Sequence, residues 1–342
     1  MKTRTISHKA LTGLLLTLGL VSHHEAIASD LAARPEVTQF INDMVSKHQF
    51  DKSELFRIFD DVVEKPKIIE ALDKPSTSRP WYLYHPNFIN VTRISHGLAF
   101  MKQYAPELAA AEKQYGVPAE VIAAILGVET DYGRNAGSFR AIDALSTIAF
   151  DYPRRADYYK GELEAFLILA RDEKLDPASF KSSYAGALGL PQFMPSSFHQ
   201  YAVDATNDQH KDIWNTPADA IASVANYLHS FGWQKDQNAI VKATVTGETY
   251  PTLVADKFNL HYTIADMAKF GVTPAERVDA QEKAVLFPIE TAPDKIEYLL
   301  GLNNFYVITR YNKSTLYALS VINLANTLKT GMASLQETAA SS

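Results

Sequence analysis

The segment Gly116-Val-Pro-Ala-Glu-Val-Ile-Ala-Ala-Ile-Leu-Gly-Val-Glu-Thr-Asp-Tyr-Gly133 carries the clearest helical pattern of this chain. Pro118 suits the first turn of a helix, and Gly133 suits its end. Four residues between them recur at spacings of three and four and therefore share one helix face: Ile122, Ile125, Leu126 and Glu129. A carboxylate thus occupies a position where the pattern requires an apolar side chain.

This placement predicts an unusual ionisation for Glu129. Burial penalises the charged form of a carboxyl group and raises its pKa, and the negative end of the helix dipole acts in the same direction. Both effects favour a protonated Glu129 near neutral pH, which is the state that a general acid needs. Two structural alternatives stay open: Glu129 pairs with Arg134 or another cation, or it faces water at a frayed helix end.

A second group of polar side chains lies in the segment 182–197, which is rich in Gly, Pro and Ser. Ser183, Tyr184 and Gln192 are side chains of the kind that bind sugar hydroxyls and amides. The alternative is an ordinary loop between helices that ends at a capping Ser197.

The beginning of the chain is typical of an export signal. Three basic residues (Lys2, Arg4 and Lys9) precede an apolar run over 11–21, and Ala26-Ile-Ala28 has the small-x-small pattern of a signal-peptidase site. The run is shorter than the roughly 20 residues that a membrane-spanning helix needs. We therefore expect residues 1–28 to be a signal peptide and the mature protein to be periplasmic. The alternative is a frayed amphipathic helix on a cytosolic protein.

Composition excludes several classes of protein. With 342 residues, 46% of them hydrophobic and 21% charged, the chain can bury a large core in one to three domains. Its formal charge of -6 argues against nucleic acid and anionic membranes as main partners. It has no cysteine, so we expect neither thiolate chemistry nor a lipidated membrane anchor, but a soluble form. Zinc-helix, phosphate-loop and dinucleotide motifs are missing, and no catalytic cofactor is expected.

Helical periodicity dominates the rest of the sequence and predicts a mainly α chain of the α+β class. We expect helices over 36–115, with one long helix from about Phe88 to Tyr115, a second helical unit over 116–233, and a last helix over 314–328. A small β-containing insertion over 235–311 is predicted from three short β-branched or aromatic runs: Ala243–Thr246, Ala284–Phe287 and Phe305–Thr309. Residues 330–342 are expected to form a loose tail.

Several motifs taken together resemble the lytic murein transglycosylase B family. They are Val128-Glu-Thr130 with Tyr132-Gly133, Ser183-Tyr-Ala-Gly-Ala187, Gln192-Phe-Met-Pro-Ser-Ser197, Ala220-Ile-Ala-Ser-Val-Ala-Asn-Tyr-Leu228 with Gly232-Trp233, and Tyr306-Val-Ile-Thr-Arg-Tyr-Asn312 with Ser314 and Tyr317. They follow one another in order over residues 35–329. The resemblance implies an N-terminal helical domain (29–115), a lysozyme-like catalytic core (116–234), a small β-containing insertion (235–311) and a C-terminal helix (312–329) that returns to the core.

The same resemblance implies that Glu129 is the sole catalytic acid and base. It implies cleft positions for six further residues: Ser183, Gln192, Tyr227, Tyr311, Asn312 and Tyr317. Tyr84 and Tyr158 match aromatic positions that line the same groove. For each tyrosine the alternative is core packing with a hydrogen-bonded hydroxyl group.

The implied reaction is the nonhydrolytic cleavage of the β-1,4 bond between N-acetylmuramic acid and N-acetylglucosamine in peptidoglycan. Glu129 would protonate the bridging oxygen, the acetamido group of the substrate would assist, and ionised Glu129 would then take the C6 hydroxyl proton to close a 1,6-anhydro ring. One alternative is a hydrolytic muramidase with Asp131, Asp143 or Asp151 as second carboxylate. Another is a noncatalytic peptidoglycan-binding protein. Glycan strands are the expected partner, and other cell-wall enzymes are further candidates.

A third group of residues, Asp204-Ala-Thr-Asn-Asp-Gln-His-Lys-Asp-Ile-Trp214, carries oxygen ligands at alternating positions, as calcium loops do. The resemblance places an EF-hand-like structural calcium site here, with five ligands: Asp204, Thr206, Asp208, the His210 carbonyl and Asp219. The loop departs from the pattern because Gln209 replaces the turn-making glycine and Asn215 replaces the glutamate expected at the twelfth position. In the alternative interpretation, Asp219 forms a capping box with Thr216.

Overall fold

The computed structural model describes residues 31–73 and 79–340; the predicted signal peptide lies outside them. The helices before the sheet are η1 (Leu31–Ala33), α1 (Pro35–His48), α2 (Lys52–Asp60), α3 (Pro66–Asp73), α4 (Trp81–Tyr84), η2 (His85–Asn87), α5 (Val91–Gln103), α6 (Ala105–Tyr115), α7 (Ala119–Thr130), α8 (Ala141–Asp151), η3 (Pro153–Arg155), α9 (Ala156–Asp172), η4 (Pro177–Ser179), α10 (Pro195–Tyr201) and α11 (Pro217–Ser230). A two-stranded ladder, β1 (Phe139–Arg140) with β2 (Lys181–Ser182), lies among them. None of the helices in this described part is long and apolar enough to cross a membrane.

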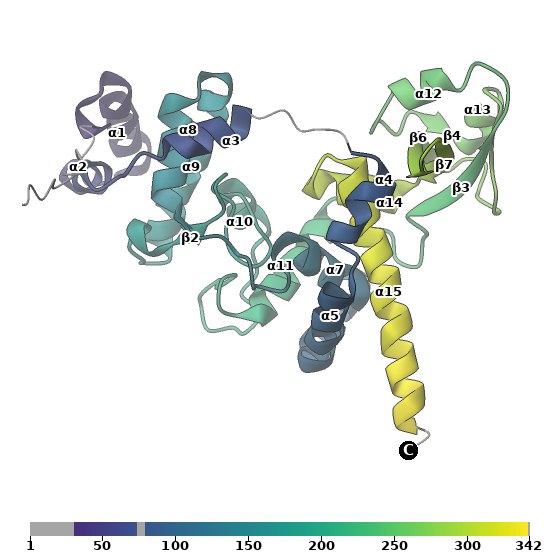
Figure 1. The fold of residues 1–342 in the computed structure, drawn as a ribbon. Coiled ribbons are helices and arrows are strands. Elements are labelled where there is room, and N and C mark those ends of the chain that lie inside the picture. Colours follow the sequence, from purple (N-terminus) through teal and green to yellow (C-terminus); the bar gives the residue numbers. More distant parts are fainter. Residues whose placement is uncertain (1–30, 74–78, 341–342) are drawn as a thin grey trace, which may run out of the picture.

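The first three α-helices pack on α8 and α9 and form one end of the molecule (Figure 1). Their sequence favours this because α1 turns an apolar face of Val37, Phe40, Ile41 and Met44 into the core. The ring of Phe40 meets Phe150 of α8 edge-on, at a centroid distance of 5.9 Å. This end of the molecule therefore unites segments that are far apart in the sequence.

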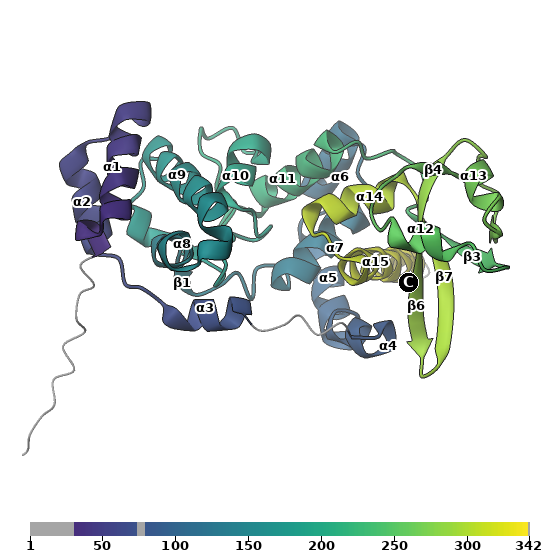
Figure 2. The ribbon, with the colours of Figure 1, turned by 90° about the horizontal axis from the view of Figure 1, so that it is seen from above.

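Helix α7 lies in the centre of the molecule, surrounded by α5, α6, α11 and the last helix, α15 (Thr315–Ala340). Figures 1 and 2 both show α15 running beside α7 and α5. Every residue of α7 from Ile122 to Thr130 is buried except Glu129. The predicted apolar helix is thus a core helix with a single carboxylate near its C-terminal end.

The β-part is an antiparallel sheet with the strand order β4-β6-β7-β3-β5. Its strands are β3 (Ile240–Val245), β4 (Tyr262–Thr263), β5 (Val272–Pro274), β6 (Lys283–Ala292) and β7 (Lys295–Gly301), accompanied by α12 (Pro251–Ala255) and α13 (Ile264–Ala268). One face carries a small core of its own, which includes Val241, Leu286 and Leu300. The mainly helical class with a small β-part is confirmed.

Three local predictions were wrong. Residues Phe305–Thr309 are not a strand but belong to α14 (Asn303–Tyr311), in which Phe305 stacks on Phe287 at 4.7 Å. The expected long helix over 88–115 is two helices that meet at Tyr104, because Pro106 cannot continue an existing helix. Residues 330–340 of the expected loose tail are helical, since α15 continues to Ala340.

The packing also groups the helices differently from the predicted order of domains. Helices α1–α3, from the first half of 29–115, contact α8 and α9, whereas α5 and α6, from its second half, contact α7 and α11. The chain therefore passes from one end of the molecule to the centre, returns, and passes to the centre again.

Candidate active site

Glu129 lies in the last turn of α7, half-buried, and its carboxylate accepts a hydrogen bond of 2.6 Å from the hydroxyl of Tyr317. Burial raises the pKa of Glu129 to about 7, although the bond from Tyr317 lowers it. No ion pair within the described residues includes Glu129, and the Arg134 guanidinium donates instead to the Asp131 carbonyl oxygen, at 3.2 Å. A large fraction of Glu129 is therefore protonated at neutral pH, as a general acid requires.

The backbone after Glu129 is held against the segment that carries Ser183 and Gln192. The hydroxyl of Thr130 lies 3.0 Å from the Leu190 carbonyl oxygen, to which it donates, and it accepts the N–H of Gly133 at 3.0 Å. On its other side this segment approaches Ile213, which Gly189 makes feasible: its φ is +64°, and a Cβ there would lie 2.6 Å from the Ile213 carbonyl oxygen.

Three predicted tyrosines gather next to Glu129 from α11, α14 and α15. Tyr317 and Tyr311 lie nearly parallel, with an interplanar angle of 12° and centroids 6.4 Å apart, and Tyr311 contacts Tyr227 at 4.7 Å. The hydroxyl of Tyr311 donates to the Pro191 carbonyl oxygen at 2.6 Å, and that of Tyr227 donates to the Arg310 carbonyl oxygen at 2.7 Å. Burial, followed by the charge of Glu129, raises the pKa of Tyr311 and Tyr317 well above the usual range. Of these three tyrosines, only Tyr317 donates its hydroxyl hydrogen bond to Glu129.

Tyr84 of α4 lies within electrostatic reach of Glu129: burial raises the pKa of Tyr84, and the charge of Glu129 adds to this rise. A cavity of about 530 Å³ adjoins this region. Its lining includes Trp81, three residues before Tyr84, and Thr315 and Leu316, which directly precede Tyr317. The N-terminal segment thus supplies an aromatic group to the site.

Of the other predicted contact residues, Gln192 lies in the segment that Thr130 contacts, Ser183 lies in the turn before it, and Asn312 directly follows Tyr311. Gln192 has a left-handed φ of 53°, and its amide donates to the carbonyl oxygens of Gly189 at 2.9 Å and Ala136 at 3.2 Å. The Ser183 hydroxyl accepts the N–H of Ala187 at 3.1 Å and so stabilises its own turn. Asn312 ends α14 with an exposed side chain.

Tyr158, on α9, is 45% exposed. Burial of its ring and the neighbouring Glu162 raise its pKa. Burial likewise raises the pKa of Tyr227, and the phenols of Tyr201 and Tyr158 add to this rise. Tyr158 therefore belongs to the same aromatic surroundings as Tyr227.

Comparisons with known proteins agree with this geometry. The family model "Transglycosylase SLT domain" matches residues 32–326. The membrane-bound lytic murein transglycosylase B of Escherichia coli is 42% identical over 308 residues, which are 87% of this chain and 84% of that protein. The chain belongs to the lytic murein transglycosylase B family.

Two solved structures resemble the fold of this family member. The Escherichia coli lytic transglycosylase Slt35 in complex with calcium is 40% identical, with a TM-score of 0.81 over 89% of this chain and 96% of that one. SltB3 from Pseudomonas aeruginosa in complex with NAG-anhNAM-pentapeptide is 30% identical, with a TM-score of 0.75 over 85% of this chain and 78% of that one. The predicted family is confirmed.

The three rival carboxylates are all engaged elsewhere. Asp131 is paired with His96 at 3.0 Å, Asp143 with Arg140 at 2.7 Å, and Asp151 with Arg34 at 2.8 Å. Burial raises the pKa of Glu129 and the Tyr317 hydrogen bond lowers it; no carboxylate among the described residues contributes to the rise. The geometry thus supplies one carboxyl group where a two-carboxylate hydrolase needs two.

Sequence reasoning missed the neighbours that support the site. Arg93 and His96 of α5 both approach Asp131, and Tyr201 of α10 contacts the ring of Tyr227 at 4.7 Å. The spacing of Arg93 and His96, three residues apart on one helix, was the only available signal, and it does not say which element they face.

The predicted calcium loop is held by bonds between its own carboxylates and its backbone. Asp204 accepts the N–H groups of Asp208 at 3.2 Å and Gln209 at 2.8 Å. Asp219 is fully buried and accepts those of Ala205 and Asp212, each at 2.9 Å. Thr216 makes no side-chain capping bond, so the capping-box interpretation is wrong.

These loop residues partly fit a metal ion. Burial raises the pKa of Asp219, and the charge of Asp204 adds to this rise, so a cation between the two would relieve the repulsion. Their oxygen donors suit calcium. Across residues 31–73 and 79–340, however, no three side chains of His, Cys, Asp or Glu converge as a metal site. A bound ion would therefore require carboxylates to turn away from backbone amides.

Proposed function

We propose that Glu129 is the single acid and base with which this lytic transglycosylase cuts the glycan strands of peptidoglycan. The observation that carries the proposal is a carboxyl group with a pKa of about 7, bonded to Tyr317, which no cation and no second carboxylate of the described residues accompanies. Such a group can donate a proton at neutral pH and, once ionised, can accept one. The reaction needs both abilities, because Glu129 acts as an acid in its first step and as a base in its second.

In the first step, protonated Glu129 donates its proton to the oxygen between N-acetylmuramic acid and N-acetylglucosamine, and the glycosidic bond breaks. The positive charge that develops at the anomeric carbon needs a partner, which in two-carboxylate glycosidases is the second acid. Because the rival carboxylates are engaged elsewhere, the acetamido oxygen of the substrate fills this role by forming a bond to the anomeric carbon as the leaving sugar departs. Tyr317 stabilises the newly formed Glu129 carboxylate through its 2.6 Å bond.

In the second step, the Glu129 carboxylate removes the proton of the muramic C6 hydroxyl. The C6 oxygen then attacks the anomeric carbon and displaces the acetamido oxygen, which closes the 1,6-anhydro ring. Glu129 returns to its protonated state, and no water is consumed. We assign the binding of the strand to the residues around Glu129: Ser183, Gln192, Tyr227, Tyr311, Asn312 and Tyr317, with Tyr84 and Tyr158 as further aromatic contacts.

Glu129→Gln tests the proposal, because the amide keeps the shape and the Tyr317 contact but cannot donate the proton. We expect the release of soluble fragments from purified cell-wall sacculi to fall by at least about a hundredfold, while cosedimentation with the sacculi persists. Glu120→Gln is the matched control: it makes the same change in the first turn of α7, where Glu120 pairs with Lys329 at 3.1 Å. Near wild-type release by Glu129→Gln would end the assignment.

Mass spectrometry of the fragments separates this reaction from hydrolysis. Transglycosylation leaves muramic ends that are one water lighter than hydrolytic ends. Products that carry the added water would favour the muramidase mechanism. Binding without release by the wild-type protein would favour a noncatalytic role.

We also propose a structural calcium ion in the 204–219 loop, held by Asp204, Thr206, Asp208, the His210 carbonyl and Asp219. The buried Asp219 supports this, because it is a carboxylate whose charge no ion pair within the described residues compensates. Calcium added to chelator-treated protein should raise the melting temperature, and Asp204→Asn should reduce that rise. An identical melting temperature with and without calcium contradicts the site.

We propose export to the periplasm, with residues 1–28 removed as a signal peptide. The basic start, the apolar run and the Ala26-Ile-Ala28 pattern support it. N-terminal sequencing of protein from a periplasmic extract should begin at Ser29. An intact N-terminus on cytosolic protein contradicts the proposal.

A further inference from the structure

The backbone just after Glu129 adopts a conformation that needs outside support. Asp131, Tyr132 and Gly133 follow one another with φ values of 51°, 59° and 89°. This left-handed region suits glycine but is unfavourable for residues with a side chain, above all for a large one such as tyrosine. The turn therefore persists because neighbouring elements hold it, and its shape sets the direction in which the last turn of α7 presents Glu129.

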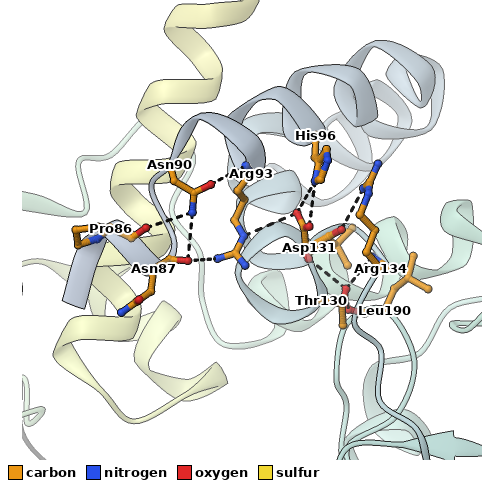
Figure 3. A network of polar contacts seen from close by, with 11 residues as sticks. Pro86, Asn87, Asn90, Arg93, His96, Thr130, Asp131, Arg134 and Leu190 are labelled. Atoms are coloured by element: carbon orange, nitrogen blue, oxygen red, sulfur yellow. Dashed lines mark hydrogen bonds and ion pairs between the residues drawn. The ribbon is translucent and has the colours of Figure 1, made fainter. Parts of the chain in front are cut away.

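The support comes from α5 (Figure 3). The Nδ1 atom of His96 lies 3.0 Å from both carboxylate oxygens of Asp131, and the Nε atom of Arg93 lies 3.8 Å from one of them. Arg134 donates to the Asp131 carbonyl oxygen at 3.2 Å, so both ends of the residue are held. The Asp131 and Arg93 side chains are only 13% and 17% exposed, which limits competition from water.

Arg93 also connects this turn to the segment that carries Tyr84. Its guanidinium donates to the Asn87 carbonyl oxygen at 2.9 Å and lies over the ring of Phe88 at 5.2 Å. The ring of Phe88 in turn contacts Tyr84 at 5.2 Å. Asn90 fixes the start of α5 by accepting the N–H of Arg93 at 3.0 Å and donating to Pro86 at 3.2 Å. One cation thus lies between the turn after Glu129 and an aromatic neighbour of Glu129.

We propose that Asp131, held by His96 and Arg93, is a positioning residue that aims the Glu129 carboxyl group and fixes its distance from Tyr84. The inference rests on the proposed role of Glu129. It gives Asp131 a function other than that of a second catalytic carboxylate: both of its oxygens are directed at α5. An acid that is misaimed by about an ångström still allows the strand to bind but transfers its proton slowly.

Asp131→Asn, which keeps the size of the side chain but removes its charge, tests the proposal in the full chain on soluble glycan strands of alternating N-acetylglucosamine and N-acetylmuramic acid. We expect kcat to fall about tenfold to a hundredfold while KM changes by less than about threefold, because only transition-state alignment is lost. The pH profile of kcat should keep both limbs. Asp172→Asn is the control: this carboxylate is exposed on α9, pairs with the adjacent Arg171 at 3.3 Å, and its replacement should leave turnover unchanged.

A pair of changes at His96 gives an independent measurement if Asp131→Asn does not fold. His96→Asn places an amide N–H close to the position of Nδ1 and should retain most of kcat, whereas His96→Leu removes the donor and should lose it to the same extent as Asp131→Asn. Equal rates for the two His96 variants, or a wild-type kcat in Asp131→Asn, overturn the proposal.

Two further outcomes distinguish this role from the others. A loss as deep as that of Glu129→Gln, together with the loss of the acidic limb, would make Asp131 a catalytic group and overturn the positioning role. Glu129→Gln is assayed in parallel: if it stays active, the proposed function fails, whereas an inactive Glu129→Gln beside a fully active Asp131→Asn contradicts only the positioning role.

Discussion

Removing the Tyr317 hydroxyl should shift the pH dependence of the reaction, because its bond is the contact that lowers the pKa of Glu129 against the effect of burial. A hydrogen bond to a charged acceptor contributes about 1.5–3 kcal/mol, against about 1 kcal/mol for a neutral one. Tyr317→Phe therefore destabilises the carboxylate relative to the protonated acid by about 1.4 kcal/mol, which corresponds to about one pKa unit. The pKa of Glu129 should rise from about 7 by that amount.

The sign of the kinetic effect follows from the role of the protonated form. The alkaline limb of the kcat profile reports loss of the Glu129 proton, so it should move upward by about one pH unit in Tyr317→Phe. The assay is the initial rate of 1,6-anhydro product formation across the neutral range, quantified by chromatography and mass spectrometry. A lower maximal rate is also expected, because a weaker acid donates its proton less readily.

Tyr311→Phe is the matched control for this shift. Its ring lies parallel to that of Tyr317, but its hydroxyl donates to the Pro191 carbonyl oxygen rather than to Glu129. Its rate can fall, but its alkaline limb should stay in place. If the limb of Tyr317→Phe also stays, or moves to lower pH, the Tyr317 bond does not control the ionisation of Glu129 and the reasoning is refuted.

Two substitutions are expected to change the free energy of unfolding. The folded-state pKa of Glu129 lies at about 7, above its usual 4.5, so ionisation destabilises the fold as the pH rises through this range. At pH 8, Glu129→Gln should therefore be about 3 kcal/mol more stable to unfolding than wild type, with no difference at pH 4, as urea titrations at the two pH values would measure. Gly189→Ala should lose about 2 kcal/mol or more in the same titration, because φ is +64° and the added Cβ meets the Ile213 carbonyl oxygen; Gly161→Ala, where nothing lies within 4 Å of an added Cβ, should lose none.

The sequence by itself determined features that depend on near neighbours along the chain. The Pro118 start, the apolar spacing and the Gly133 end predict α7 and place Glu129 on its buried face, because helix periodicity is a local property. The runs at Ala243–Thr246 and Ala284–Phe287 overlap β3 and β6 for the same reason. The ordered motifs also indicated the family. The run Phe305–Thr309 is too short for its pattern to distinguish a strand from a helix, and the strand prediction failed there. The segment is helical, and its Phe305 packs against Phe287 of the sheet.

Only the tertiary structure decided what surrounds Glu129. The donor of its 2.6 Å bond, Tyr317, is 188 residues away in the sequence, and the group that holds the following turn, His96, precedes it by an entire helix. The partners of Asp131 could not be predicted from the sequence either, since spacing predicts which helix face a residue occupies but not which element packs there. Proximity across the fold is set by how apolar faces combine into one core, and many arrangements satisfy the same local pattern. The acidity of Glu129 depends on that combination, because burial and hydrogen bonding act through space rather than along the chain.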